Sequence, residues 1–368
     1  MSCRVIRRIF LRTFAKIFYM SDFHSLSISE VKNETPNSVS ITFEVPDHLA
    51  EIFKFKAGQY ITLKHKIDGI EVRRAYSLCT SPNSHELKVG VKKVKDGCFS
   101  VFANEILKAG DTLEVMHPQG NFKFEPNEAD QNKYVAFVAG SGITPVISII
   151  KDVLEREPKS SIVLVYGNQS IKESMFYAEL QALQQNNADR FNIEYIFSRR
   201  KEENALLGRI DRSVVNYLLK NKYGESTFDL FYLCGPEAMI NEVSETLQDR
   251  GVDKEKILYE LFTSSEEGEL SEGHEGDTTV TITLDDVSDT FVMSKKQSVL
   301  DAALEKGLDA PFSCQGGICS TCIARLTKGK VEMRKNEILT DKELEEGFIL
   351  TCQSHPTTPT LEIDYDDV

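Results

Sequence analysis

Several common features are missing from this chain of 368 residues. It contains no stretch close to the roughly 20 consecutive apolar residues that a membrane-spanning helix requires. Its net charge is −14, whereas nucleic-acid binding needs a concentrated basic face. Its seven histidines form no i,i+4 pair and no H-x-H motif, so they predict no histidine metal site. These absences argue against a membrane-spanning protein and against a nucleic-acid-binding protein.

The negative charge is concentrated near the C-terminus. Residues 266–368 contain 22 acidic and 9 basic residues, a net charge of −13, whereas residues 1–19 contain five basic and no acidic residues. With 41% hydrophobic and 27% charged residues, the composition is that of an ordinary globular protein of two or three domains. The acidic end is either a docking surface or a solubility feature.

Residues 1–22 are set apart from the rest of the chain. They are consistent with an amphipathic targeting helix, or with an extension ahead of a start at Met20. No secretory signal is recognisable, and eight cysteines in a chain of this length favour a reducing cytoplasm and a metal site over a disulfide framework.

The remaining sequence divides into three blocks and a linker. Residues 23–128 read as short alternating strands separated by turns, which predicts an all-β barrel. Residues 129–262 alternate buried-type strands with helices, which predicts an α/β domain with a parallel sheet. Residues 263–277 are acidic and glycine-rich and predict a linker, and residues 278–368 return to strands, one helix and a cysteine-rich loop.

Specific elements follow from these patterns. In the first block the expected strands include 38–45, 60–63 and 87–92. In the second block the expected strands are 134–139, 162–166, 191–197 and 229–233, alternating with helices 146–155, 176–184, 212–220 and 237–250. In the third block the expected elements are strands 280–284 and 290–293 and a helix at 299–306.

The cysteine loop is the strongest local signal. Cys314, Cys319, Cys322 and Cys352 have the spacing C-x4-C-x2-C-x29-C, which is the plant-type [2Fe–2S] pattern. Two glycines between the first two cysteines allow backbone amides to approach the sulfurs. A four-cysteine zinc site is the alternative, but such sites usually pair two short C-x2–4-C units. The segment resembles a plant-type ferredoxin domain.

Two glycine turns in the second block indicate a dinucleotide site. Gly140 and Gly142 follow a buried strand and precede a helix, with Thr144 expected at the N-cap and Pro145 at the first helical position. Gly235 and Pro236 form a similar turn after another strand. Free amides at such helix starts suit a diphosphate, and two such turns would line one crevice.

Together these motifs resemble the pyridine-nucleotide domain of the ferredoxin–NADP reductase superfamily. The resemblance places Ser198 and Arg199 against a ribose 2′-phosphate and so implies NADPH; a solvated surface arginine pair is the alternative. The same resemblance covers a first-block R-x-Y-S motif, in which Arg74 and Tyr76 share one face of a strand and Ser77 lies near the reactive end of a flavin.

The resemblance implies further site residues. Gly97 and Ser100 match a second phosphate-contacting turn, and Glu260 and Phe262 match the family's terminus near flavin and nicotinamide. Cys234 would lie beside the nicotinamide, so Ser77, Cys234 and Glu260 are the candidate catalytic residues. Cys79 and Cys98 are expected to be small buried residues.

The domain order resembles that of one-chain reductases that serve oxygenases, such as phenylacetyl-CoA epoxidase reductase and ketosteroid-hydroxylase reductase subunits, which have the same layout. The implied architecture is multi-domain: an all-β flavin-binding barrel, an α/β nucleotide-binding domain and an α+β β-grasp ferredoxin domain. The implied cofactors are FAD, NADP(H) and a [2Fe–2S] cluster, and the implied partner is an oxygenase component. A reductase of another hydroxylase or of free ferredoxin, and a nonenzymatic redox sensor or electron carrier, are the alternatives.

Overall fold

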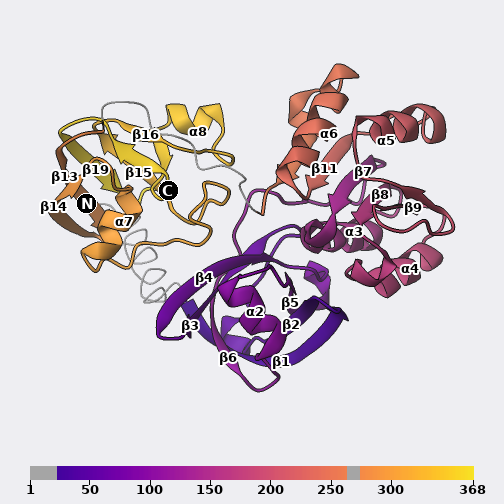
Figure 1. Cartoon of the computed structure of the whole chain (residues 1–368), viewed down its shortest axis with the longest axis horizontal. Coiled ribbons are helices and arrows are strands. Elements are labelled where there is room, and N and C mark those ends of the chain that lie inside the picture. The colour runs from indigo at the N-terminus through magenta and orange to yellow at the C-terminus, as the bar shows by residue number, and fades with distance from the viewer. Residues whose placement is uncertain (1–22, 263–273) are drawn as a thin grey trace, which may run out of the picture.

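The computed structural model of the chain describes residues 23–262 and 274–368 and contains three domains (Figure 1). The barrel, the parallel sheet and the C-terminal domain follow one another along the chain, as the sequence predicts. The expectations for residues 1–22 and for most of the predicted linker concern residues outside this description.

The first domain is an antiparallel sheet that curls toward closure. Its strand order is β4-β3-β6-β1-β2-β5, and Leu78, directly after β4, bridges to Val89 of β5 at the opposite edge. Alternate strand residues such as Leu26, Ile41 and Ile61 are fully buried inside the curl. The elements are β1 (Phe23–Thr35), β2 (Ser38–Glu44), β3 (Tyr60–Ile67), β4 (Ile70–Ser77), β5 (Leu87–Lys92), α2 (Cys98–Glu105) and β6 (Thr112–Met116).

The second domain is a parallel sheet with helices on both faces. Its order is β10-β9-β8-β7-β11-β12, and every pairing is parallel. The elements are β7 (Lys133–Ala139), α3 (Ile143–Arg156), β8 (Ser161–Asn168), α4 (Tyr177–Asn186), β9 (Phe191–Phe197), β10 (Ala205–Leu207), α5 (Arg212–Tyr217), β11 (Leu230–Cys234), α6 (Glu237–Asp249) and β12 (Ile257–Glu260). Along β7, Ala136 and Val138 pack with α3 while Val135 and Phe137 pack with α6, so the strand is apolar on both faces.

Two predicted helix ends in this domain are wrong. Helix α3 begins at Ile143 with Gly142 at its N-cap, after a 3-10 turn at Gly140–Gly142, so Thr144 and Pro145 lie inside the first turn. Proline is tolerated there because the first-turn amides have no intrahelical partner in any case. Helix α5 ends at Tyr217 and continues as a π-helical turn, Leu218–Lys222.

The third domain, residues 277–368, is a mixed sheet covered by one helix, which is the predicted β-grasp arrangement. Its main sheet has the order β14-β13-β19-β15-β17, with β13 and β19 parallel, and α7 buries Val299, Leu300 and Ala303 in the domain core. The elements are β13 (Asp277–Leu284), β14 (Val287–Ser294), α7 (Val299–Glu305), β15 (Ile323–Lys328), β16 (Val331–Met333), α8 (Asp341–Glu345), β17 (Phe348–Leu350), β18 (Ser354–Pro356) and β19 (Thr360–Asp364).

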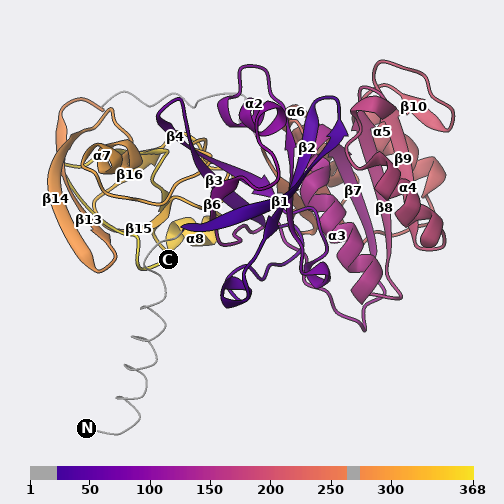
Figure 2. The same ribbon diagram turned by 90° about the horizontal axis from the view of Figure 1, so that it is seen from below.

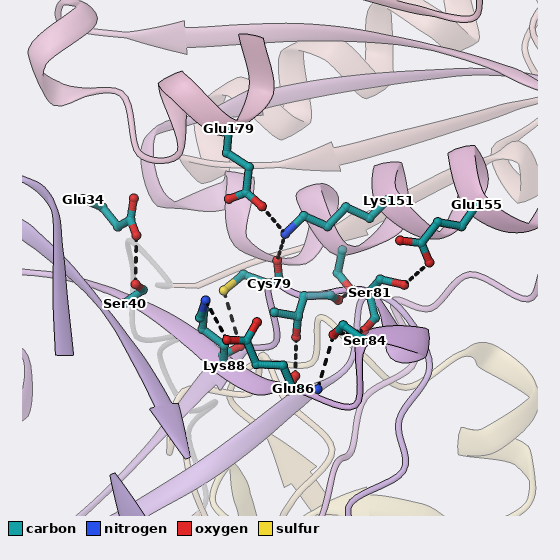
Figure 3. A network of polar contacts seen from close by, with 12 residues as sticks. Glu34, Ser40, Cys79, Ser81, Ser84, Glu86, Lys88, Lys151, Glu155 and Glu179 are labelled. Atoms are coloured by element: carbon teal, nitrogen blue, oxygen red, sulfur yellow. Dashed lines mark hydrogen bonds and ion pairs between the residues drawn. The ribbon is translucent and has the colours of Figure 1, made fainter. Parts of the chain in front are cut away.

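One face of α3 holds the first domain against the second. Ser148, Lys151 and Glu155 recur at helical spacing and meet residues 79–81, which follow β4 and Leu78. Figure 3 shows Lys151 and Glu155 reaching Cys79 and Ser81. Lys151 Nζ donates to the Cys79 carbonyl at 2.8 Å and pairs with Glu179 at 2.7 Å. Ser148 Oγ donates to the Thr80 carbonyl at 2.6 Å, and Ser81 Oγ donates to Glu155. The end of β4 is therefore fixed relative to the nucleotide-binding sheet.

Candidate functional site

The two glycine turns of the second domain meet at one edge of its sheet. Strands β7 and β11 are neighbours, and the chain departs in opposite directions across the sheet from this point, which is where α/β proteins bind ligands. A Cβ at Gly142 would lie 2.2 Å from the carbonyl oxygen of Cys234, so only glycine allows the two turns to pack this closely. The two predicted turns, at Gly140 and Gly142 and at Gly235 and Pro236, therefore lie against each other, and the dinucleotide crevice between them stays a prediction.

Thr144 and Pro145 are buried in the first turn of α3, next to the Gly140–Gly142 turn. Thr144 is 1% exposed, and its hydroxyl donates to the Ser141 carbonyl at 3.1 Å. Its methyl group packs close to Gly90 of β5. Both residues therefore support the turn from below, and their predicted contact with a nucleotide stays a prediction.

Ser198 and Arg199 lie at the same sheet edge, after β9. Both are exposed, and their backbone amides donate to the carbonyls of Asn168 and Gln169 at 2.9 Å and 3.2 Å. Within residues 23–262 and 274–368, the ion pairs include no carboxylate partner for Arg199. Its guanidinium is therefore available to an anionic ligand.

The first domain gathers the predicted flavin contacts around β4 and α2. Arg74 is exposed and Tyr76 half-buried on the same face of β4, and the Tyr76 ring lies 5.5 Å from Phe99 in the first turn of α2. Burial raises the pKa of Tyr76, so its phenol stays protonated. Gly97 is the N-cap of α2, whereas the Ser100 hydroxyl accepts from the Val94 amide at 3.1 Å within its own turn.

The three candidate catalytic residues come together although they are far apart in the sequence. Ser77 Oγ donates to Glu260 Oε2 at 3.2 Å across a separation of 183 residues. Glu260 on β12 is the strand partner of Cys234 on β11. Burial raises the pKa of Glu260 to about 8, partly offset by the Ser77 hydrogen bond, and burial also raises the pKa of Cys234. The site can therefore hold a proton near neutral pH.

A pocket where the three domains meet adds residues that the sequence analysis missed. Tyr60, Glu260 and Cys319, one from each domain, are among its lining residues. Tyr60 is the strand partner of Ser77, and its hydroxyl lies 3.1 Å from Thr321 Oγ1, which donates to Gln119 at 3.1 Å. Tyr60 stands in an ordinary strand pattern, so no local signal distinguishes it.

The four cysteines of the loop form two pairs. Cys314 hydrogen-bonds with Cys319, and Cys322 with Cys352. The Gly316 amide donates to Cys314 Sγ at 3.3 Å. Gly317 has φ +72°, and a Cβ there would lie 2.7 Å from the Lys335 carbonyl, so this position requires glycine.

This donor set fits a [2Fe–2S] cluster. Hydrogen bonds, from Cys319 and from backbone amides, lower the pKa of Cys314 to about 6, toward the thiolate form that binds metal. The bond from Cys322 likewise lowers the pKa of Cys352, whereas the same bonds and burial raise the pKa of the partners Cys319 and Cys322, so one thiol of each pair gives up its proton more readily than the other. The four thiols lie as two pairs, and two thiol pairs suit the two irons of such a cluster.

Models of known families match all three domains. An oxidoreductase FAD-binding domain matches residues 25–124, an oxidoreductase NAD-binding domain residues 137–245, and a 2Fe-2S iron-sulfur cluster binding domain residues 282–357. One of the subunits of 1,2-phenylacetyl-CoA epoxidase from Escherichia coli is 38% identical, over 94% of this chain and 99% of that protein. The ferredoxin reductase component of 3-ketosteroid-9-alpha-monooxygenase from Rhodococcus rhodochrous is 34% identical, over 92% and 96%. The chain belongs to this family of oxygenase reductase components.

The reductase also shares its architecture with a solved structure. Phthalate dioxygenase reductase, described as a modular structure for electron transfer from pyridine nucleotides to [2Fe–2S], aligns with a TM-score of 0.59 over 93% of this chain and 98% of that one. Its sequence identity of 21% makes this a likeness of fold. The reductase is thus an oxidoreductase with FAD-binding, NAD-binding and [2Fe–2S] domains. This finding argues against the alternative of a nonenzymatic redox sensor or electron carrier.

Two further expectations concern the rest of the reductase. Cys79 is buried as expected, with its thiol donating to the Lys88 carbonyl at 3.3 Å and burial raising its pKa to about 12. The expectation for Cys98 is wrong, because the first position of α2 turns its side chain outward and leaves it exposed. Among the described residues, no helix combines the length and apolarity that crossing a bilayer requires.

Proposed function

We propose that this reductase oxidises NADPH and delivers electrons singly to the oxygenase component of a multicomponent oxygenase, with phenylacetyl-CoA epoxidase as the specific partner. The observation that carries the proposal is the junction pocket, where Glu260, Tyr60 and the cluster ligand Cys319 line one space. The name and end-to-end match of the Escherichia coli relative support the choice of partner.

The chain's own residues divide the work of binding. Arg74, Tyr76, Gly97 and Ser100 would hold FAD, the two glycine turns would hold the nicotinamide dinucleotide, and the four loop cysteines would hold the cluster. When bound, the flavin supplies conversion of a two-electron hydride transfer into single-electron steps and the cluster supplies a one-electron carrier. Ser77 and Glu260 would orient the reacting rings and hold one proton, while Phe262 would cover them on the nucleotide side.

Selection of NADPH over NADH is assigned to Ser198 and Arg199. Arg199 is exposed at the sheet edge that carries the glycine turns, and a guanidinium fork matches a phosphate dianion. We expect Arg199→Ala to raise KM for NADPH about ten- to a hundredfold, the worth of a hydrogen bond to a charged group, and to leave KM for NADH nearly unchanged. Equal effects on both nucleotides in steady-state assays would remove this assignment.

A reductase role toward another hydroxylase is the second candidate, because the Rhodococcus relative, at 34% identity, is named for a ketosteroid monooxygenase. A cytoplasmic location fits either partner, since thiolate ligands must stay reduced until they bind iron.

The proposal is tested first by the visible spectrum of the purified protein under anaerobic conditions. We expect flavin and iron–sulfur bands that both bleach when NADPH is added. A colourless protein, or one whose bands ignore NADPH, would contradict the proposed electron path. The partner is then tested by mixing the protein with the oxygenase component of phenylacetyl-CoA epoxidase: epoxide formed in step with NADPH consumed supports it, and NADPH consumption without epoxide favours another acceptor.

A further inference from the structure

Two neighbouring arginines leave β4 on opposite faces. Arg74 is exposed and shares its face with Tyr76, toward the predicted flavin site. Arg73 is only 4% exposed, although it carries a full charge. A buried guanidinium is stable only where anionic partners and ring faces replace water, so the surroundings of Arg73 require an explanation.

The partners of Arg73 come partly from the third domain. Its Nη2 lies 2.7 Å from Asp309 Oδ1, and its guanidinium carbon lies 4.4 Å from the centroid of the Phe312 ring. From its own domain, Glu71 accepts from Nε at 2.9 Å, and the Phe23 ring lies 5.1 Å away. A planar cation thus makes an ion pair and a stacking contact to the third domain at once.

Asp309 and Phe312 belong to the short segment between α7 and Cys314, the first cluster ligand. Arg73 therefore contacts the third domain a few residues before the cluster loop. Two other contacts lie on or beside this loop. Thr321, in the loop, lies 3.1 Å from the Tyr60 hydroxyl, and Lys335, whose carbonyl lies against Gly317 of the loop, pairs with Glu237 at 3.3 Å. In Figure 2, β4 is the strand of the first domain that lies nearest the third domain.

We propose that Arg73 is a positioning residue for electron transfer within the chain: it clamps the segment 309–312 of the third domain to β4, so that the cluster loop faces the junction pocket. The inference rests on the proposed function, because Arg73 can position the cluster loop for electron transfer only if electrons pass from the flavin to the cluster. Arg73 exchanges no proton or electron itself. It acts by keeping the gap short, since electron tunnelling slows steeply with distance.

The test separates the two halves of the electron path. In stopped-flow experiments on the holoenzyme, Asp309→Arg, which places a second guanidinium against Arg73, is expected to leave the rate of flavin bleaching by NADPH within about twofold of wild type. Cluster bleaching is expected to slow at least tenfold. Arg73→Leu should act in the same direction, whereas Arg73→Lys, which keeps the charge but loses the planar fork, should recover part of the rate.

A second measurement does not depend on turnover. Small-angle X-ray scattering of Asp309→Arg, with and without cofactors, should show a larger radius of gyration than wild type. Lys328→Ala is the matched control, because it breaks the exposed Lys328–Glu362 pair within the third domain and should change neither measurement. Unchanged cluster bleaching and unchanged scattering in Asp309→Arg would overturn the proposal, as would equal slowing of flavin and cluster. Failure of NADPH to bleach the wild-type flavin would instead contradict the proposed function.

Discussion

The cysteine loop and the Ser77–Glu260–Cys234 site both bring several side chains together, but the loop takes most of them from one short segment and the second site takes them from distant parts of the chain. Three of the four cysteines proposed to hold the cluster lie within nine consecutive residues, Cys314 to Cys322, and the loop backbone itself donates a hydrogen bond to the sulfur of Cys314. Ser77 and Glu260, by contrast, are separated by 183 residues and come from two domains. The first site depends on a short loop keeping its shape, and the second depends on two domains keeping their distance.

This difference predicts that cluster binding can be abolished while flavin reduction by NADPH is retained. Cys322→Ala removes one of the buried cysteines proposed to hold the cluster, so we expect iron and sulfide content to fall nearly to zero, the largest effect of any single change proposed here. NADPH should still bleach the flavin. Iron analysis and the visible spectrum measure both halves.

Cys98→Ala is the matched control, because Cys98 is an exposed cysteine outside the loop. It should retain full iron content. Loss of flavin binding together with the cluster in Cys322→Ala would show that the two sites are not independent.

The Ser77–Glu260–Cys234 site should lose activity when one hydrogen bond is removed. Ser77→Ala removes the donor to Glu260, and we expect the rate of flavin bleaching by NADPH to fall about ten- to a hundredfold, while iron content stays unchanged. Ser84→Ala, an exposed serine of the same domain, should have no effect.

The double variant sharpens this prediction. If Ser77 and Glu260 act as a unit, combining Ser77→Ala with Glu260→Gln should slow flavin bleaching much less than the product of the two single decreases in rate. Fully multiplicative effects would show that the two side chains work separately.

The same contrast explains what the sequence could and could not predict. The cysteine spacing and the glycine turns are local patterns that the sequence displays directly. The structure packs the two glycine turns against each other, and their roles in binding cofactors stay predictions. Strands such as β5 and β9 begin and end at the predicted residues, because their apolar runs are bounded by polar residues. The start of α3 was misjudged, because Thr144 and Pro145 are strong N-terminal signals and the preceding 3-10 turn carries none.

Residues that act between domains were not predictable in this way. Tyr60, Thr321 and Arg73 stand in ordinary strand or loop sequence, and only the packing of one domain on another gives them partners. The sequence indicates Glu260 by resemblance alone, and the structure adds the reason for its chemistry: burial of its carboxyl group, on the strand next to Cys234, raises its pKa.

The most gradual expected effect concerns the proton on Glu260, because it develops over several pH units. Its folded-state pKa is about 8, whereas an unfolded glutamate has a pKa of about 4.3. Between these values the folded chain holds a proton that the unfolded chain has released, so the free energy of unfolding falls as pH rises, by at most about 1.4 kcal/mol per pH unit. Glutamine cannot ionise. The free energy of unfolding of Glu260→Gln, relative to that of wild type, should therefore increase as the pH rises from 5 to 8 and stay constant above pH 8.

Denaturant unfolding of the two proteins at each pH measures this difference. Glu225→Gln, which removes one exposed negative charge from the same domain, controls for a general change in surface charge. A stability difference between Glu260→Gln and wild type that does not change with pH would mean that Glu260 is already ionised in the folded chain. The cluster site and the Ser77–Glu260–Cys234 site would then differ in how they are assembled but not in whether they hold a proton, and Ser77 would be donating to a permanent carboxylate.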